Sequence, residues 1–404
     1  MLRAFRSSAG LALFASACLT PSGAGPSAGS AGTPRAIATT AAATPAKRVT
    51  SGSGALVARD RPPSPPATSV PRPSAIVTSP GLRVLPWAGF KSAVTYTFDD
   101  TQPSQTEHWP ELEATGVPMT FFANPKGSRE QASYDADWSR VTAAGSELGN
   151  HTSSHCRPDL TGCLPVGTAG DEIDQASAYI ASRLGMKAVT SFAAPFGNAE
   201  WNKLAASRFL IGRGVVNGTV PPSGITDWYN LPCFPVSTGQ TATAFNAGID
   251  RARAQGHWLI FLFHTIRPTT ADWYAGVDIA GITASIAHAK SLGDVWIDTM
   301  TEVGAYARAQ QTFERLTPTN NVWTWTLPAH FPPHKFLRVM IAGGTLTQAG
   351  QQLAWDPHGY YEVALDAGPL TWAPCPTLRT RRLLGGWSVG AADGAGESAV
   401  GDRS

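Results

Sequence analysis

The chain has 404 residues, a formal net charge of +2 and only 15% charged residues. Such a sparse and nearly balanced charge offers no basic surface for nucleic acid, so we expect no nucleic-acid partner. The length predicts two or three domains. The hydrophobic content of 43%, with 13 tryptophans, is sufficient for a folded core.

The first residues have the pattern of a secretory signal peptide over 1–18. Arg3 and Arg6 precede a short apolar run, and a small-residue cleavage site follows at Ala15-Ser16-Ala17. The apolar run is too short to span a bilayer as a lasting helix. Because Ala15-Ser16-Ala17-Cys18 also resembles a bacterial lipobox, lipidation of Cys18 and simple cleavage after Ala17 stay open as alternatives. Either predicts export to the extracellular space or the cell envelope.

Residues 19–80 are dominated by Ala, Ser, Thr, Pro and Gly. Such a segment buries too little apolar surface to offset its ordering entropy, so we expect a disordered linker. The composition then changes twice more. We predict a catalytic domain over 81–315, a small β-rich domain over 316–376 and a disordered tail over 377–404.

From about residue 92, short apolar runs alternate with helical stretches. Strands are predicted at 93–98, 118–123, 147–150, 188–193, 209–216, 258–263 and 295–298. Helices are predicted at 105–115, 134–144, 169–184, 199–207, 242–255, 272–292 and 300–311. Capping boxes at Ser104/Glu107 and Thr299/Glu302 support two helix starts. Apolar strands alternating with helices indicate an α/β fold with a parallel sheet, and about seven units predict a distorted or incomplete (β/α) barrel.

The segment after residue 316 predicts a small all-β domain, with strands at 322–327, 336–341 and 360–365. Its aromatic residues could bind polysaccharide or pack against the barrel, and we favour packing. They are Trp323, Trp325, Trp355, Tyr360 and Trp372.

Ionisable residues follow three of the predicted strands, where barrels of this kind place their active sites. Asp99 and Asp100 end the first strand, His151 and His155 follow the third, and His264 ends the run 259–263. The two histidines spaced i, i+4 would share one face of a helical turn. One carboxylate and two imidazoles make a three-ligand site with an open position, typical of a catalytic metal. One carboxylate and one imidazole remain for proton transfer.

Five motifs occur in the order seen in polysaccharide deacetylases, the NodB-like carbohydrate esterases of family four. They are Thr97-Phe98-Asp99-Asp100, His151-Thr152-Ser153-Ser154-His155, Pro195-Phe196-Gly197, Asp227-Trp228 and Leu262-Phe263-His264. The chain resembles this family over residues 92–312. The resemblance implies a barrel of the NodB type, a divalent ion (most simply Zn²⁺) and removal of acetyl groups from N-acetylated or O-acetylated sugars.

The resemblance also implies the roles of the ionisable residues. Asp99 matches the general base, and His264 matches the acid that protonates the leaving group. Asp100, His151 and His155 match the metal ligands.

The same resemblance implies the residues around the substrate. Pro195 and Phe196 match the loop that walls the groove, with the Phe196 N–H as a donor to the oxyanion. Asp227 matches the carboxylate that orients the acid histidine. Trp228 matches a pocket residue, and Leu262 matches the residue that contacts the acetyl methyl group.

Two departures from the family pattern affect the base. The third motif usually begins with an arginine that orients the base carboxylate, and here Ala193 stands there. Arg213 and Arg267 are the candidate replacements. Thr101 stands where the family usually has glycine after the Asp pair.

Export permits disulfides. Without Cys18 four cysteines remain, and sequence does not choose among their pairings. Cys156 and Cys163 could close a small loop after the second metal histidine, and Cys233 could then pair with Cys375. Free buried thiols are the alternative.

We therefore predict an exported, monomeric, metal-dependent deacetylase that acts on an acetylated polysaccharide or oligosaccharide, with N-acetylated sugars preferred. An acetylxylan-type O-deacetylase is one alternative. A carbohydrate-binding protein without catalysis is another, because of Ala193. A glycosidase would need two carboxylates and no metal, which leaves the paired histidines without a role.

Overall fold

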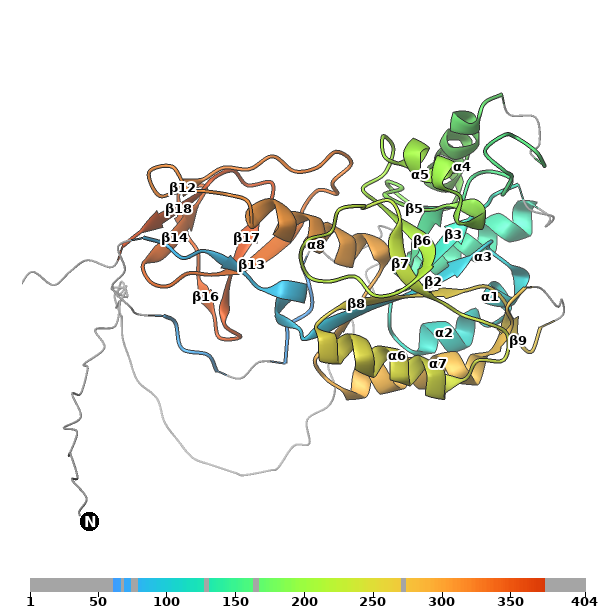
Figure 1. The fold of residues 1–404 in the computed structure, drawn as a ribbon, viewed down its shortest axis with the longest axis horizontal. Coiled ribbons are helices and arrows are strands. Elements are labelled where there is room, and N and C mark those ends of the chain that lie inside the picture. The colour runs from blue at the N-terminus through green and yellow to red at the C-terminus, as the bar shows by residue number, and fades with distance from the viewer. Residues whose placement is uncertain are drawn as a thin grey trace, which may run out of the picture.

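The computed structural model describes residues 61–66, 69–73, 79–126, 131–162, 167–269 and 274–374 (Figure 1). The predicted signal peptide 1–18, with Cys18, and the predicted tail 377–404 lie outside the described residues, as does most of the predicted linker. None of the helices in the described part has the length and apolar character needed to cross a membrane.

Seven parallel strands form a closed barrel in the described part of the chain. They are β2 (Ser92–Asp99), β3 (Thr120–Ala123), β4 (Glu147–Asn150), β5 (Ser191–Ala193), β6 (Ile211–Asn217), β7 (Leu231–Pro235) and β8 (Trp258–Phe263). The barrel closes where β2 pairs with β8, from Ala93↔Trp258 to Phe98↔Phe263. Strand β11 (Val295–Ile297) adds to the start of β2. The predicted (β/α) barrel is confirmed.

Helices cover the outside of this barrel. They are α1 (Pro103–Glu107), α2 (Trp109–Ala114), α3 (Gln131–Ala143), α4 (Ala169–Arg183), α5 (Ala199–Ala205), α6 (Ala242–Gln255), α7 (Ile279–Ser291) and α8 (Met300–Phe313). Every residue of β2 and of β8 is buried, because these strands have side chains inside the barrel on one face and helices on the other.

The helix starts predicted at residue 272 and at the Ser104 cap differ from the structure. Helix α7 begins at Ile279 instead of residue 272, because β10 (Val277–Asp278) first pairs with β9 (Ile266–Arg267). Ser104 caps no helix, since its hydroxyl accepts a hydrogen bond from the Ile266 N–H. The cap at Thr299 is present, where its hydroxyl accepts from the N–H of Glu302.

Strand β7 was missed from the sequence because its residues, Leu-Pro-Cys-Phe-Pro, include two prolines that cannot donate to a strand ladder. The pairing of β6 with β7 is irregular. Its register shifts between Arg213 and Asn217, which marks a β-bulge in β6. The bulge lies at the strand end nearest to the predicted site.

The C-terminal residues form an all-β module of two antiparallel four-stranded sheets, orange in Figure 1. One sheet holds β1 (Arg83–Val84), β13 (Phe336–Met340), β17 (Tyr360–Ala364) and β16 (Trp355–Asp356). The other holds β12 (Val322–Trp323), β18 (Leu370–Ala373), β14 (Thr345–Gln348) and β15 (Gln351–Gln352). The module includes β1, which precedes the barrel in the sequence, so its sheet extends beyond the predicted range 316–376.

Part of the predicted linker packs on this β module. The buried Arg338 guanidinium donates hydrogen bonds to the carbonyls of Pro62, Pro63 and Ala88 at 2.7–2.8 Å. The Val70 N–H donates to a carbonyl of the module at 2.8 Å. This differs from the disorder predicted up to residue 80, because composition does not reveal a buried cation that binds the linker backbone. The other predicted domain boundaries stay predictions.

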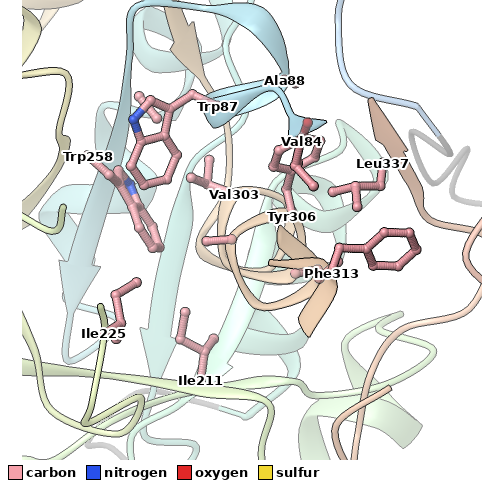
Figure 2. Close-up of a cluster of buried hydrophobic side chains, with 14 of the residues drawn as sticks. Val84, Trp87, Ala88, Ile211, Ile225, Trp258, Val303, Tyr306, Phe313 and Leu337 are labelled. Carbon is pink, nitrogen blue, oxygen red and sulfur yellow. The ribbon is translucent and has the colours of Figure 1, made fainter. Parts of the chain in front are cut away.

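Helix α8 lies between the barrel and the β module, and its side chains contact both (Figure 2). Val303 and Tyr306 of α8 share one buried cluster with Trp87, Trp258 and Leu337. Trp258 begins β8 and Leu337 lies in the module. The module therefore covers the end of the barrel where the strands begin, opposite to the strand ends that carry the predicted site.

The aromatic residues of the β module are in packing positions. Trp323, Tyr360 and Trp372 are buried. The Trp325 indole donates to the Leu365 carbonyl at 2.9 Å, and its ring lies 4.8 Å from that of Phe313 in α8. Trp355 is half-buried and donates to a linker carbonyl. These contacts favour the packing role over an exposed sugar platform.

Candidate metal centre and catalytic site

The predicted metal ligands lie together at the C-terminal ends of β2 and β4. The ligand atoms of Asp100, His151 and His155 all lie within 4.8 Å of one another. Both histidine Nε2 atoms face Asp100 Oδ1, at 3.4 and 3.3 Å. This oxygen is buried and has no hydrogen-bond partner among the described residues. A buried carboxylate oxygen between two imidazole nitrogens fits a divalent cation that takes nitrogen and oxygen ligands.

The two histidines are brought together by a loop and not by the helical turn that their spacing predicted. Residues 151–155 have no helical structure, and Thr152 and His155 have positive φ values of 60° and 54°. Side chains fix the loop instead. Asn150 accepts from the Thr152 N–H, the Thr152 hydroxyl accepts from the His155 N–H, and Glu172 accepts from both the N–H and the hydroxyl of Ser154.

The His151 ring is oriented by a backbone carbonyl. Its Nδ1 donates to the Ala193 carbonyl at 2.7 Å, so that Nε2 faces Asp100. Such a hydrogen bond fixes the tautomer and orientation of a metal-ligating histidine. This hydrogen bond uses only the backbone carbonyl of residue 193, so it does not depend on the side chain at that position.

The charges of the cluster shift its pKa values. Burial opposes ionisation of Asp100, but the neighbouring histidines, His151 first, outweigh it and hold the pKa of Asp100 well below its ordinary value. Burial also opposes the charged form of His151, yet Asp99 and Asp100 raise its pKa. For His155, burial and the charge of His151 lower the pKa to about 4. A neutral His155 beside an ionised Asp100 has the protonation state that metal binding requires.

Asp99, the predicted base, lies beside this cluster and is only 4% exposed. Its Oδ2 is 3.9 Å from His151 Nε2. Arg213 Nη2 donates to both of its carboxylate oxygens. Of the two candidate replacements for the missing arginine, Arg213 contacts the base, whereas Arg267 lies in β9 against Gly276.

His264, the predicted acid, approaches the second carboxylate oxygen of Asp100, with Nε2 at 4.0 Å from Oδ2. Burial lowers the pKa of His264. Its Nδ1 is buried and has no hydrogen-bond partner within the described residues. The ring of Tyr274, which is 74% exposed, meets the His264 ring edge-on at 5.0 Å.

The Asp227-Trp228 motif does not have the placement expected for it. Asp227 is exposed and accepts a hydrogen bond from the Tyr229 N–H, in place of one from His264. The Trp228 indole donates to Gln311 of α8 at 2.8 Å, so its ring packs on that helix. The physical reason is local: a short aspartate side chain two residues before an N–H closes its own turn.

Gln105 connects the base strand to the acid strand, and no sequence pattern indicated it. This fully buried side chain donates from Nε2 to the carbonyl of Asp99 at 2.7 Å and to that of His264 at 3.0 Å. It therefore holds the ends of β2 and β8 at a fixed separation.

The residues predicted to contact substrate lie in two places. Pro195 is buried, and Phe196, 58% exposed, has its ring 4.6 Å from that of His155. Phe196 adopts a φ of 59°, a left-handed conformation that turns this loop toward the metal ligands. Leu262 is buried in β8, two residues before the acid.

Thr101 also has a positive φ, 46°, at the position where the family pattern has glycine. Its hydroxyl donates to Asn124 at 2.9 Å and accepts from Tyr134 at 3.1 Å. These hydrogen bonds offset the strain of a β-branched residue in this conformation.

The cysteines agree with only part of the prediction. Cys156 forms a disulfide, and its predicted partner Cys163 lies outside the described residues. Cys233 is a free, buried thiol, so its pairing with Cys375 is wrong. Its thiol donates to the Gly214 carbonyl inside the barrel.

One family model matches the part of the chain that holds the first three motifs. Residues 89–210 match the family described as polysaccharide deacetylase. No curated protein matches the chain.

Several solved structures are similar at low identity. The Xyl-CE4 domain of a xylanase from the hindgut metagenome of Trinervitermes trinervoides is 18% identical, with a TM-score of 0.37, over 52% of this chain and 88% of that one. A polysaccharide deacetylase from Bacillus cereus is 20% identical, with a TM-score of 0.34, over 51% and 91%. A peptidoglycan deacetylase from Bacillus subtilis is 19% identical, with a TM-score of 0.34, over 52% and 89%. The family match over residues 89–210 confirms the resemblance to the polysaccharide deacetylases that the motifs predicted.

Proposed function

We propose that this protein is an exported, metal-dependent polysaccharide deacetylase that removes acetyl groups from N-acetylated glycans. The observation that carries the proposal is the Asp100–His151–His155 cluster, with the buried Asp99 3.9 Å from His151 and His264 4.0 Å from Asp100. Zn²⁺ is the proposed ion, since two imidazoles and one carboxylate form a common catalytic zinc set. We further propose that the protein acts as a monomer and that Cys18 is either lipidated or removed with the signal.

A divalent ion at this site would supply Lewis acidity toward water and toward the acetyl carbonyl. Asp99, buried and held by Arg213, accepts the proton of the attacking water. The Phe196 N–H, on the loop beside His155, donates to the oxyanion that forms from the acetyl carbonyl. His264 then donates a proton to the departing nitrogen.

The contact between Arg213 and Asp99 favours this function over a carbohydrate-binding protein without catalysis. That alternative depended on the loss of the arginine at position 193. The choice between N-acetyl and O-acetyl groups depends on the substrate experiment below.

Acetate release by a chain of residues 61–374 tests the function. We would assay N-acetylglucosamine oligomers and acetylated xylan in parallel, with chelator and with zinc restored. Zinc-dependent release from the oligomers is expected. Release from xylan alone would favour the O-deacetylase, whereas no release despite zinc binding would favour the binding protein. Release that ignores the chelator would refute the metal mechanism.

A matched pair of variants controls this experiment. H155A should abolish both zinc binding and acetate release, because it removes one of three ligands. H288A removes a histidine that pairs with Asp250 on the surface. It should change neither property.

A further inference from the structure

The base carboxylate is held by one buried guanidinium. Arg213 is 0% exposed, and its Nη2 donates to both oxygens of Asp99. Its Nη1 donates to the Gly214 carbonyl at 2.9 Å, and its Cζ lies 5.2 Å from the centre of the Phe122 ring. A side chain held on three sides has little rotational freedom, so it fixes the plane of the carboxylate that it contacts.

The bulge in β6 produces this geometry. The register of β6 against β7 shifts just after Arg213, and Val215 and Val216 turn outward to solvent. Gly214 lies at the bend, and a Cβ there would lie 2.0 Å from the side-chain oxygen of Asn230, so a larger residue would force that side chain to move. Bulges next to active sites commonly re-aim a side chain in this way.

Arg213 also lies directly beside Ala193. The two residues are Cα partners in the parallel pairing of β5 with β6. Register partners on neighbouring strands present their side chains to the same face of a sheet. A guanidinium from either position can therefore enter the same part of the barrel interior, and the methyl group of Ala193 leaves that space to Arg213.

We propose that Arg213 is the positioning residue for Asp99, supplied from β6 in place of the β5 position now occupied by Ala193. It orients one carboxylate oxygen toward the cluster, where Oδ2 is 3.9 Å from His151 Nε2. The inference rests on the proposed function, because Asp99 needs a defined orientation only if it accepts a proton. A purely structural ion pair would support folding and nothing else.

Steady-state kinetics of acetate release from N-acetylglucosamine oligomers, or from acetylated xylan if that is the substrate, test this role. R213M should lower kcat by about 10²-fold, the scale expected for a misplaced catalytic group, with KM and zinc affinity unchanged. R213K should lower kcat by a smaller factor, since lysine keeps the positive charge. R253K alters an ion pair with Asp294 far from the motifs and should match the wild type. Equal kcat values for R213M and the wild type would refute the inference.

Two further variants separate positioning from folding. In a D99N background, R213K should not slow the residual rate further, because Arg213 acts through Asp99; an equal fall in both backgrounds would refute the role. The exchange A193R/R213A returns the guanidinium to β5 and should recover at least part of the rate lost in R213A. Failure to recover in a protein that binds zinc normally would refute the exchange between strands. A wild-type protein that releases no acetate would instead refute the proposed function, and with it the inference.

Discussion

Glu172 should control metal affinity although it does not contact the predicted ion. Its carboxylate is fully buried in α4 and accepts hydrogen bonds from the Ser154 N–H at 2.8 Å and from the Ser154 hydroxyl at 2.9 Å. Ser154 immediately precedes the ligand His155. Replacing Glu172 with alanine removes both acceptors and leaves the part-buried Ser154 N–H without its partner. The loop that carries both histidines then loses the attachment to α4 that Ser154 makes, and keeps the one made by Asn150 just before it.

The structure sets the size of the effect. Two hydrogen bonds to a charged group, each about 1.5–3 kcal/mol, give an upper limit of about 6 kcal/mol of lost folding free energy for E172A. The loss in E172Q should be near 1–2 kcal/mol, since the amide oxygen still accepts one bond and the hydroxyl can reverse its role (about 1 kcal/mol per neutral bond). Outer-shell partners of metal ligands are typically worth 10–100-fold in affinity, or about 1.4–2.7 kcal/mol. E172A should therefore weaken zinc binding within that range.

Isothermal titration with zinc, and thermal unfolding with chelator present, measure the two effects separately. D174A is the matched control, because Asp174 lies on the same helix and forms a surface ion pair with Arg208. D174A should change the free energy of unfolding by no more than about 1 kcal/mol and should leave zinc affinity unaltered. If E172A melts earlier but binds zinc as the wild type does, the loop is held by its other hydrogen bonds and the reasoning is wrong.

Three other variants test the framework of the site and of the fold. Replacing Gln105 with leucine removes the link between the ends of β2 and β8; acetate release should fall about tenfold and unfolding free energy by about 1–3 kcal/mol, measured by kinetics and by denaturant titration. Replacing Trp325 with alanine should lower unfolding free energy by about 2–4 kcal/mol and leave kcat unchanged, because the β module lies at the opposite end of the barrel. A chain that begins at residue 81 should melt roughly 5–10 °C below one that begins at 61, since Arg338 loses its linker carbonyls; equal melting temperatures would contradict that role.

Apolar periodicity was enough to predict most of the barrel. Strands buried on both faces appear as continuous apolar runs, and the predictions at 147–150 and 258–263 coincide with β4 and β8. Strand β7 could not be predicted in this way. Its two prolines indicate a break when only the local pattern is considered, and its strand conformation is set by pairing with β6 and β8 on either side.

The site was predictable where the chemistry lies in local motifs. Asp100, His151 and His155 lie together as their motifs indicated. The loop conformation around them was not predictable from spacing, because side-chain hydrogen bonds within the loop and to Glu172 of α4 determine it. The predicted contact between Asp227 and His264 was wrong for a local reason. The Asp227 carboxylate accepts a hydrogen bond from the Tyr229 N–H two residues later and does not reach the acid histidine.

The position of Arg213 shows why one missing motif residue is weak evidence for lost catalysis in a barrel. The interior of a parallel barrel receives side chains from every strand, and register partners such as Ala193 and Arg213 point into the same volume. The base Asp99 needs a guanidinium in that volume, and any strand whose side chain reaches the volume can supply it. An inactive barrel should therefore lack a cation at every register neighbour of the motif position. Here one such neighbour is a buried arginine on the base itself, which favours an active enzyme.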